Sequence, residues 1–431
     1  MRVLSRIDLR GFVGDVAERL PRPVAPADGP VDAVREILAA VKARGDDALR
    51  EFTQRFDGVE LVSTRVDPAE IEAAKGRIPA DVLAALEAAA ESIAAYHEAQ
   101  MPHDVDFRRP GLTIAGMHRP VERAGCYVPG GRAVYPSTVL MTAVPARVAG
   151  VEEIVLCVPP GPDGKVPDVT LAAAAVAGVI EVIPVGGAQA IGAMAYGTET
   201  IRPVDVIVGP GNVYVALAKQ EVAGVVGVPS SFAGPSEVVV IADGSAPADF
   251  AAIDVILQAE HGPDGLAWLI TWDEAVADEV TAAVERLVAT APRRADIEAT
   301  LEKSGYAVVC DSAEQALAVS NFIAPEHLEL QTEDPASLIP LVRHAGAVFC
   351  GPWSPASIGD YVAGPSHVLP TNGTARFASA LTVRDFMKDI HVVTADQGGL
   401  LAMGDHVEAL AGAEGLDAHA ASIRIRRGAS S

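Results

Sequence analysis

An alternation of short β-branched runs with alanine-rich stretches fills most of the chain from about residue 117, and it limits the fold more than any other feature. The runs EEIVLC (152–157), EVVVIAD (237–243) and YAVVC (306–310) have the length and composition of buried strands. Segments 213–224 and 247–260 have helical periodicity. Strand–helix alternation of this kind predicts an α/β fold with mainly parallel strands. At 431 residues, two sheets fit the chain better than one.

Helical patterns flank this alternating region. Residues 29–56 and 80–100 place Ala, Leu and Glu at helical spacing, which predicts helices before the strands begin. The last 50 residues lose the strand rhythm. We therefore expect an N-terminal helical segment and a helical C-terminal tail.

The charge balance argues against several classes of function. The chain has 33 Lys+Arg against 57 Asp+Glu, a formal net charge of −24, and half of its residues are hydrophobic. Such a surface repels nucleic-acid phosphates and anionic lipids. The start has no apolar stretch of signal-peptide length, and the longest apolar run, 171–180, is too short to span a bilayer. We expect a soluble, cytoplasmic protein without nucleic-acid or membrane partners.

The four cysteines predict neither a disulfide framework nor a cysteine zinc site. Cys157, Cys310 and Cys350 each end an apolar run, and we interpret them as core thiols. Cys126 lies in a glycine-rich stretch where exposure is an alternative. A nucleophilic cysteine would need a matched base, which the sequence does not reveal, so cysteine chemistry is the weaker hypothesis.

Three glycine-bearing loops follow predicted strands. GPGN (209–212) lies between a strand and a helix, where backbone N–H groups and a helix N-terminus favour a phosphate. It is not a GxGxxG fingerprint, because Tyr214 occupies the position of the third glycine. VGGAQA (185–190) and YVPGG (127–131) are similar. The alternative for each is an ordinary tight turn, but three together favour a ligand crevice.

Two pairs of polar residues are candidates for site chemistry. Gln258 and His261 have the i, i+3 spacing that puts two side chains on one helix face, where they could share a metal ion or simply cap the helix end. Glu326 and His327 are an acid next to an imidazole. They suit general-base chemistry, or are a solvated Glu and a packed His.

Two further segments carry polar candidates without strong periodicity. Asp360 lies in an 18-residue loop, 354–371, that also holds two glycines and His367. Such loops are often functional, although Asp360 could also be a cap. Glu414 and His419 stand near the C-terminus, where a solvated tail is the default expectation.

Together these motifs resemble those of the histidinol dehydrogenase family. The segments are ERAGCYVPGGRAVYPSTVLMTAVPA, VGGAQA, GPGN, GPSE, QAEHGPD, APEHLEL, GDYVAGPSHVLPT and EGLDAH. They occur in that family's order and span nearly the whole chain.

The resemblance implies an enzyme that oxidises L-histidinol to L-histidine through L-histidinaldehyde in two NAD⁺-dependent steps, the final step of histidine biosynthesis. It implies His327 as the general base and Glu326 as the group that activates water to hydrate the aldehyde. The residues implied as ligands of one Zn²⁺ per subunit are Gln258, His261, Asp360 and His419. Besides these ligands and His327, the implied substrate contacts are Ser236, His367 and Glu414. The implied NAD contacts are Tyr127, Gln189 and Asn212.

The resemblance also implies two Rossmann-like domains, one inserted in the other, and a homodimer. We expect an N-terminal segment (1–24), a larger α/β domain (25–129 and 236–380), an inserted incomplete Rossmann-like NAD-binding domain (130–235) and a C-terminal tail (381–431). The tail is expected to cross to the partner subunit, so that Glu414 and His419 complete the neighbour's site.

Two rival hypotheses remain open. A paralogous enzyme would oxidise another primary alcohol, such as a sulfonated diol; the presence of Glu414, available for an amine, argues against it. A regulatory protein would bind metal or nucleotide without turnover. The retained Glu326–His327 pair argues against that one.

Overall fold

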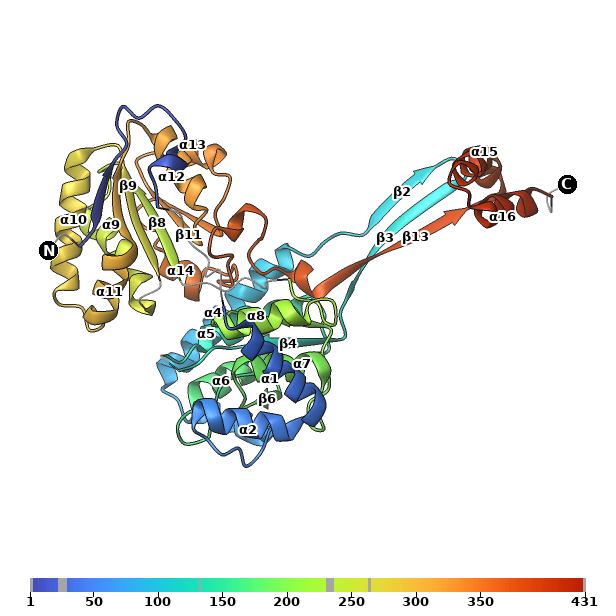
Figure 1. Cartoon of the computed structure of the whole chain (residues 1–431), viewed down its shortest axis with the longest axis horizontal. Coiled ribbons are helices and arrows are strands. Elements are labelled where there is room, and N and C mark those ends of the chain that lie inside the picture. Colours follow the sequence, from blue (N-terminus) through green and yellow to red (C-terminus); the bar gives the residue numbers. More distant parts are fainter. Residues whose placement is uncertain (1–2, 22–28, 132, 230–235, 263–264, 429–431) are drawn as a thin grey trace. The chain divides into compact units, whose positions relative to one another are not determined.

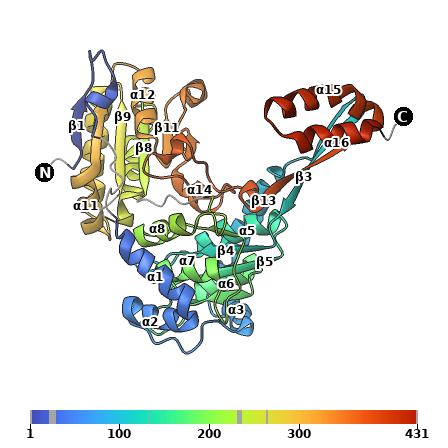
Figure 2. The same cartoon turned by 45° about the vertical axis from the view of Figure 1, so that its right-hand side comes forward.

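The computed structural model describes residues 3–21, 29–131, 133–229, 236–262 and 265–428, with the side chain of His261 outside the description. The chain divides into two compact units (Figures 1 and 2). Unit 1 comprises Met1–Gln100 and Glu122–Asp385, and unit 2 comprises Met101–Val121 and Phe386–Ser431.

Unit 1 contains a six-stranded sheet in which every neighbouring pair is parallel, in the order β1-β10-β9-β8-β11-β12. Its strands are β1 (Ser5–Asp8), β8 (Glu237–Ala242), β9 (Leu266–Thr271), β10 (Gly305–Val309), β11 (His327–Gln331) and β12 (Ala347–Cys350). The helices that accompany them are α9 (Ala248–Leu257), α10 (Glu274–Val288), α11 (Arg294–Ser304), α12 (Ala313–Ile323), α13 (Pro335–Leu338) and α14 (Ala356–Tyr361).

Both faces of this sheet are buried, which explains the continuous apolar runs of its central strands. Along β8, Val238 and Val240 pack in one hydrophobic cluster with residues of α9 and α10. The alternate residues Val239 and Ile241 pack in another cluster with residues of α12. Successive side chains of a strand point to opposite faces, so a strand covered on both sides is mostly apolar along its length.

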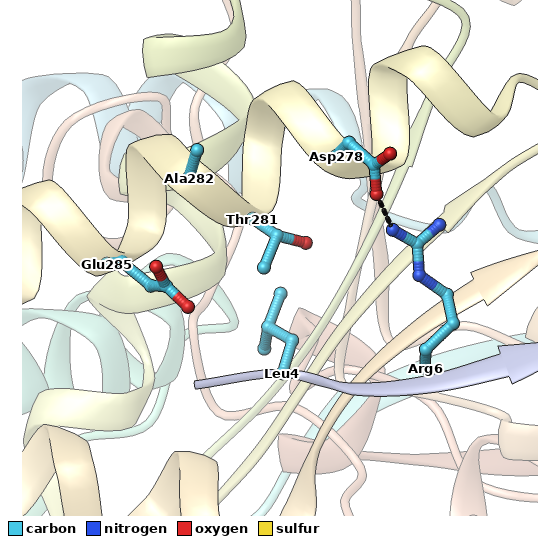
Figure 3. A pocket seen from close by; sticks show the side chains of 6 residues that line it. All are labelled: Leu4, Arg6, Asp278, Thr281, Ala282 and Glu285. Atoms are coloured by element: carbon cyan, nitrogen blue, oxygen red, sulfur yellow. Dashed lines mark hydrogen bonds and ion pairs between the residues drawn. The ribbon is translucent and has the colours of Figure 1, made fainter. Parts of the chain in front are cut away.

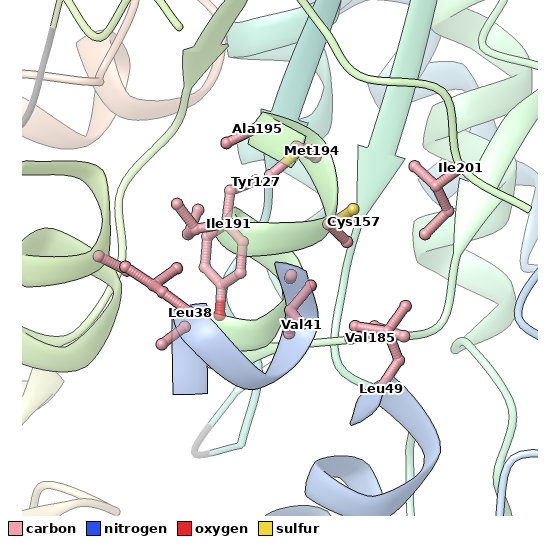
Figure 4. Packing of buried hydrophobic residues seen from close by; sticks show 14 of the residues in the cluster. Leu38, Val41, Leu49, Tyr127, Cys157, Val185, Ile191, Met194, Ala195 and Ile201 are labelled. Atoms are coloured by element: carbon pink, nitrogen blue, oxygen red, sulfur yellow. The ribbon is translucent and has the colours of Figure 1, made fainter. Parts of the chain in front are cut away.

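Unit 1 also holds a four-stranded parallel sheet in the order β6-β5-β4-β7. Its strands are β4 (Arg123–Tyr127), β5 (Glu153–Cys157), β6 (Glu181–Ile183) and β7 (Val206–Val208). The remaining α-helices of the unit are α1 (Val31–Arg44), α2 (Asp46–Asp57), α3 (Pro68–Ala73), α4 (Ala80–Ala99), α5 (Pro136–Val148), α6 (Asp168–Ala177), α7 (Gly187–Tyr196) and α8 (Val213–Val222). Figure 4 shows Leu38 and Val41 of α1 and Leu49 of α2 in one core with Tyr127 and Cys157 of this sheet.

Unit 2 is built on a three-stranded antiparallel sheet in the order β13-β3-β2. Its elements are β2 (Val105–Arg109), β3 (Leu112–Pro120), β13 (Met387–Ala395), α15 (Gln397–Ala413) and α16 (Asp417–Gly428). Short 3-10 turns in the chain are η1 (Val16–Glu18), η2 (Ala74–Gly76), η3 (Ala259–His261), η4 (Ile339–Leu341), η5 (Thr374–Arg376) and η6 (Val383–Phe386).

The predicted α/β class with two parallel sheets and terminal helices is confirmed. The helical pattern over 29–56 is two helices, since Gly45 with φ 52° separates α1 from α2. The three-stranded sheet of unit 2 was not predicted. The domain boundaries stay a prediction, although α1 and α2 pack on the smaller sheet whereas residues 25–129 were assigned to the larger domain. Within the described ranges, no helix has the length and apolar character needed to cross a membrane.

A glycine turn closes the boundary between β4 and β7, where the strand order of the smaller sheet reverses. Gly209 follows β7 with φ +104°, and a Cβ added there would lie 2.0 Å from the carbonyl oxygen of Tyr127 at the end of β4. Only glycine tolerates both the dihedral angle and the close approach. The two strand ends therefore meet with almost no space between their backbones.

We expect Gly209→Ala to lower the free energy of unfolding by more than about 4 kcal/mol, because strain and a backbone clash add together. Gly131 is a matched control, with φ +103° and nothing within 4 Å of an added Cβ. Gly131→Ala should cost only the backbone strain, about 1–3 kcal/mol. Thermal unfolding of both variants tests the difference, and equal losses would contradict a clash at Gly209.

Candidate functional site

His327 is the first residue of β11 and lies 2% exposed at the amino end of the larger sheet. Ala324 ends α12 in the left-handed region (φ 54°), which turns the chain through Pro325 into the strand. The imidazole Nδ1 lies 3.0 Å from the carbonyl oxygen of Glu237, and Nε2 lies 3.1 Å from Oδ1 of Asp360. A carbonyl oxygen only accepts, so Nδ1 donates to it, and Nε2 is the nitrogen that exchanges a proton.

Glu326 is paired with a second buried glutamate, Glu237, at the start of β8. The backbone N–H of Glu237 donates to Glu326 Oε2 (3.0 Å), and the backbone N–H of Glu326 donates to Glu237 Oε2 (3.3 Å). The N–H of Asn372 donates to Glu237 Oε1 (2.9 Å). Burial and the nearby charge of Glu326 raise the pKa of Glu237 to about 8. This reciprocal pair fixes the backbone that presents Glu326 and His327.

Opposing effects act on the pKa of His327. Burial on its own would lower that pKa, because it disfavours the imidazolium. The charges of Glu326 and Asp360, with the hydrogen bonds they accept, outweigh burial and raise the pKa well above its usual value. A change of charge at Asp360 is therefore felt directly at Nε2 of His327.

Gln258 and Asp360 lie side by side next to His327. Gln258 ends α9 and is 1% exposed, and its Nε2 donates to Asp360 Oδ2 (3.2 Å). Gln258 Oε1 is buried and has no hydrogen-bond partner among the residues that the structure describes. A buried amide oxygen in that state calls for a ligand or an ion. These two oxygen-bearing side chains fit a divalent cation such as Zn²⁺.

The structure does not test the other two predicted metal ligands, His261 and His419, or the predicted substrate contact Glu414. His261 ends η3, three residues after Gln258, but its side chain is outside the description. Glu414 and His419 belong to unit 2, where both are exposed at the end of α15 and in α16. No three His, Cys, Asp or Glu side chains gather as a metal site within the described part of the chain.

His367 connects this cluster with a helix of the smaller sheet. Its Nδ1 lies 2.9 Å from the backbone oxygen of Asp360, and its Nε2 lies 3.1 Å from the hydroxyl of Thr138 on α5. Ser366 donates to the carbonyl oxygen of Met141, also on α5 (3.0 Å). Burial lowers the pKa of His367, which favours its neutral form. The loop after α14 is thereby fastened to α5.

The predicted nucleotide loops gather at the carboxyl ends of the smaller sheet. Tyr127 ends β4, and its buried hydroxyl accepts from the N–H of Gly187 (3.1 Å), the first residue of α7. Gln189 lies on α7 and is 1% exposed. Asn212 caps α8, accepting from the N–H of Val215 (3.2 Å), and is exposed. In open α/β sheets such strand ends, at a reversal of strand order, are the usual place for a nucleotide.

Two ionisable side chains near the Gly209 turn, Lys219 and Cys126, are buried. Lys219 of α8 is 1% exposed and donates to the carbonyl oxygen of Gly209, and burial lowers its pKa to about 7. Cys126 is fully buried, and burial raises its pKa to about 12, so the alternative of an exposed thiol is wrong. Cys157 and Cys310 are core thiols as predicted, and Cys350 is partly exposed.

Ser236 directly precedes Glu237, and its carbonyl oxygen accepts from the N–H of Leu266 (3.0 Å), which places it next to the cluster. A separate hollow of about 140 Å³ lies between β1 and α10, where Arg6 and Asp278 form an ion pair (Figure 3). None of the predicted site residues lines it.

Comparison with known proteins agrees with this arrangement. The family model for histidinol dehydrogenase matches residues 21–427. Histidinol dehydrogenase of a Synechococcus strain is 52% identical over 398 residues, covering 92% of each chain. That of Gluconobacter oxydans is 48% identical over 428 residues, 98% of this chain and 99% of that protein. The crystal structure of histidinol dehydrogenase from Elizabethkingia anophelis superimposes with a TM-score of 0.95 at 36% identity, covering 100% and 99% of the chains.

The chain belongs to the histidinol dehydrogenase family. It is therefore an oxidoreductase, as predicted from the motifs. Within this histidinol dehydrogenase fold, unit 1 brings together five of the predicted site side chains: Gln258, Glu326, His327, Asp360 and His367.

Sequence reasoning missed two buried charged residues, Glu237 in the Glu326–His327 cluster and Lys219 beside the Gly209 turn. Glu237 opens a strand that is otherwise apolar, but Glu153 opens β5 in the same way and stays partly exposed, so the sequence did not indicate the burial of Glu237. Lys219 lies in the last turn of the predicted helix 213–224, a position that is typical of an exposed lysine. Its burial had no signal in the sequence.

We expect Glu237→Gln to reduce the loss of stability with rising pH. The pKa of Glu237 is about 8 in the folded protein against an ordinary 4.5. The folded state therefore keeps a proton that the unfolded chain releases, and stability falls between about pH 5 and 8. Thermal unfolding across this range measures the difference. Exposed Glu333→Gln is the control and should run parallel to wild type; a Glu237→Gln curve that also runs parallel would contradict this origin.

Proposed function

We propose that the enzyme oxidises L-histidinol to L-histidine through L-histidinaldehyde in two NAD⁺-dependent steps with one bound Zn²⁺ per subunit. The reaction would be the final step of histidine biosynthesis, and the substrate is that named by the relatives. One observation carries the proposal: the Asp360 carboxylate contacts Gln258 through Oδ2 and His327 through Oδ1. The candidate metal ligand Gln258 and the candidate base His327 thus contact the same carboxylate.

Two groups would be supplied from outside the chain. Zn²⁺ would be held by Gln258, His261 and Asp360 with His419, and it would orient the substrate imidazole and amine with a modest Lewis-acid effect. NAD⁺ would accept the hydride, with Tyr127, Gln189 and Asn212 as its contacts. The buried, unpartnered Oε1 of Gln258 supports the first group. The loops at the carboxyl ends of β4, β6 and β7 support the second.

His327 would take the alcohol proton at Nε2, since Nδ1 is engaged with the carbonyl oxygen of Glu237. Nε2 would first have to lose the proton that the Asp360 carboxylate favours, as it would if the charge of Asp360 were engaged by a metal ion. Glu326 would activate the water that hydrates the aldehyde, and His327 would act again when the hydrate is oxidised. Contacts with Glu237 through both the backbone and Oε2 support a fixed orientation of Glu326. Hydration fits a chain whose Cys126 thiol is buried and held protonated.

Substrate contacts would come from Ser236, His367 and, through the substrate amine, Glu414. The neutral imidazole of His367 can accept or donate a hydrogen bond without adding charge. Together with Glu414 these residues favour a substrate that carries an amine and an imidazole over a sulfonated diol.

The enzyme would work as a homodimer in which unit 2 completes the partner's site with Glu414 and His419. Exposed apolar side chains on unit 2 support an interface there, among them Val393, Leu410 and Ile425, which are 65–71% exposed. Such side chains would leave water if this unit packed on a partner subunit. The cytoplasmic location stays a prediction.

The decisive test is NADH formation from L-histidinol before and after chelation. We expect two NADH per histidinol, loss of activity with chelator, and recovery with Zn²⁺. Metal content measured alongside the assay separates loss of metal from loss of fold. A folded, zinc-loaded protein that forms NADH from a sulfonated diol and not from histidinol would replace this substrate. Absence of NADH with both would favour a regulatory role.

Subunit complementation tests the shared site. His327→Asn and His419→Asn each inactivate the homodimer if the two residues act in one site. Refolding an equal mixture should restore about a quarter of wild-type activity, because half of the dimers are mixed and each has one intact site. A mixture of His327→Asn with Asp360→Asn is the control and should stay inactive, since both residues lie in unit 1. No recovery in the first mixture would place each site within one chain.

A further inference from the structure

A second group of buried carboxyls lies beyond the proposed site. Asp254 on α9, with Glu329 and Gln331 on β11, are 4%, 1% and 1% exposed. Glu329 lies in the motif APEHLEL but has no role in the proposed function, and Asp254 and Gln331 lie outside the motifs. Carboxyl groups are rarely buried so completely without a role, because burial disfavours their charged form.

These side chains form a connected hydrogen-bond network. Gln331 Nε2 donates to Glu329 Oε2 (3.1 Å) and to Asp254 Oδ2. Asp254 and Glu329 are also hydrogen-bonded to each other through their side chains. Two ionised carboxylates only accept, so this last bond requires a proton on one of them. Burial, with the hydrogen bond and charge of Asp254, raises the pKa of Glu329 to about 9, which retains that proton at neutral pH.

The surroundings of Glu329 leave Asp254 as the charged group that acts on it. From α14 it accepts the backbone N–H of Ala356 at Oε1 (3.0 Å). The flanking strands β8 and β12 place Val240 and Phe349 opposite Glu329 in register. The proton is therefore shared within the pair, whose other polar contacts are the neutral donors Gln331 and Ala356.

Two members of the network, Asp254 and Ala356, each lie one helical turn before a candidate ligand. Asp254 precedes Gln258 by four residues along α9 into its C-cap. Ala356, the first residue of α14, precedes Asp360 by four residues. Residues i and i+4 lie on the same helix face, so fixing the first constrains the second. β11 itself begins with His327, which Asp360 contacts.

We propose that Asp254 and Glu329 are a proton-sharing positioning pair that fastens α9 and α14 to β11 and so holds Gln258 and Asp360 in contact beside His327. The inference rests on the proposed function for the ligand role of Gln258 and Asp360. The hydrogen-bonded pair itself does not depend on that role. Groups that orient metal ligands from outside commonly change metal affinity or activity by about 10–100-fold when replaced.

Asp254→Leu and Asp254→Asn separate positioning from simple packing. Leucine removes the hydrogen bond to Glu329, and we expect zinc affinity and kcat to fall by about tenfold or more. The KM for NAD⁺ should stay near wild type, because the nucleotide loops belong to the other sheet. Asparagine donates to Glu329 without a shared proton, so it should restore most of both quantities. Asp249→Asn, an exposed site on the same helix, is the control for a change of charge.

A metal-free measurement keeps the pair testable if Asp254→Leu fails to fold or if the proposed zinc site is wrong. Between about pH 6 and 8, one retained proton changes the unfolding constant tenfold per pH unit. In chelator, stability should fall with rising pH less steeply in Asp254→Asn than in wild type. Equal slopes would overturn the shared proton. Wild-type zinc affinity and kcat in a folded Asp254→Leu protein, or no rescue by Asp254→Asn, would overturn positioning. Absence of zinc binding by wild type would overturn only the ligand roles.

Discussion

The contact of Asp360 with the buried His327 is the interaction on which the rest of the site depends. An imidazole that is 2% exposed would be neutral on burial alone, and the carboxylates of Asp360 and Glu326 reverse this preference. Buried charges persist only when each has partners in good geometry. The carboxylate of Asp360 contacts Gln258 and His327, and its backbone oxygen accepts a hydrogen bond from Nδ1 of His367 (2.9 Å). Three segments distant in sequence, which carry Gln258, His327 and Asp360, must therefore meet at one carboxylate.

Backbone strain gathers around the same place. The described residues include two non-glycine residues with positive φ, Ala324 and Asn372, both at 54°. Ala324 ends α12 and turns the chain towards Glu326, and the backbone N–H of Asn372 donates to the carboxyl group of Glu237. Such conformations cost about 1–3 kcal/mol each and persist where surrounding contacts determine them. The reciprocal bonds between Glu237 and Glu326 are contacts of this kind, so the strain sits where the cluster fixes the backbone most firmly.

The sequence predicted those parts of the structure that follow from local pattern. Continuous apolar runs identified β8 and β10, because strands buried on both faces have few polar positions. The sheet of unit 2 gave no such signal, since every residue of β2 and nearly every residue of β13 is exposed. Its register pairs Met387 with Pro120, segments that are far apart in the chain. Gln258 and Asp360 were recognised by resemblance, whereas Glu237 and Asp254 needed the fold, because their partners come from other elements.

The two sheets of unit 1 present their functional groups at opposite ends of their strands. The loops predicted to bind the nucleotide follow the carboxyl ends of β4 and β7, which is the usual place for a nucleotide in open α/β sheets. The Glu326–His327 cluster instead stands at the amino end of β11. α14 leads the chain back towards that end, and the loop behind it is bonded to α5 through His367 and Thr138. In the proposed function, a hydride acceptor held by one sheet and a base held by the other would have to meet across this connection, and the hydrogen bonds of His367 to both sides would hold it in place.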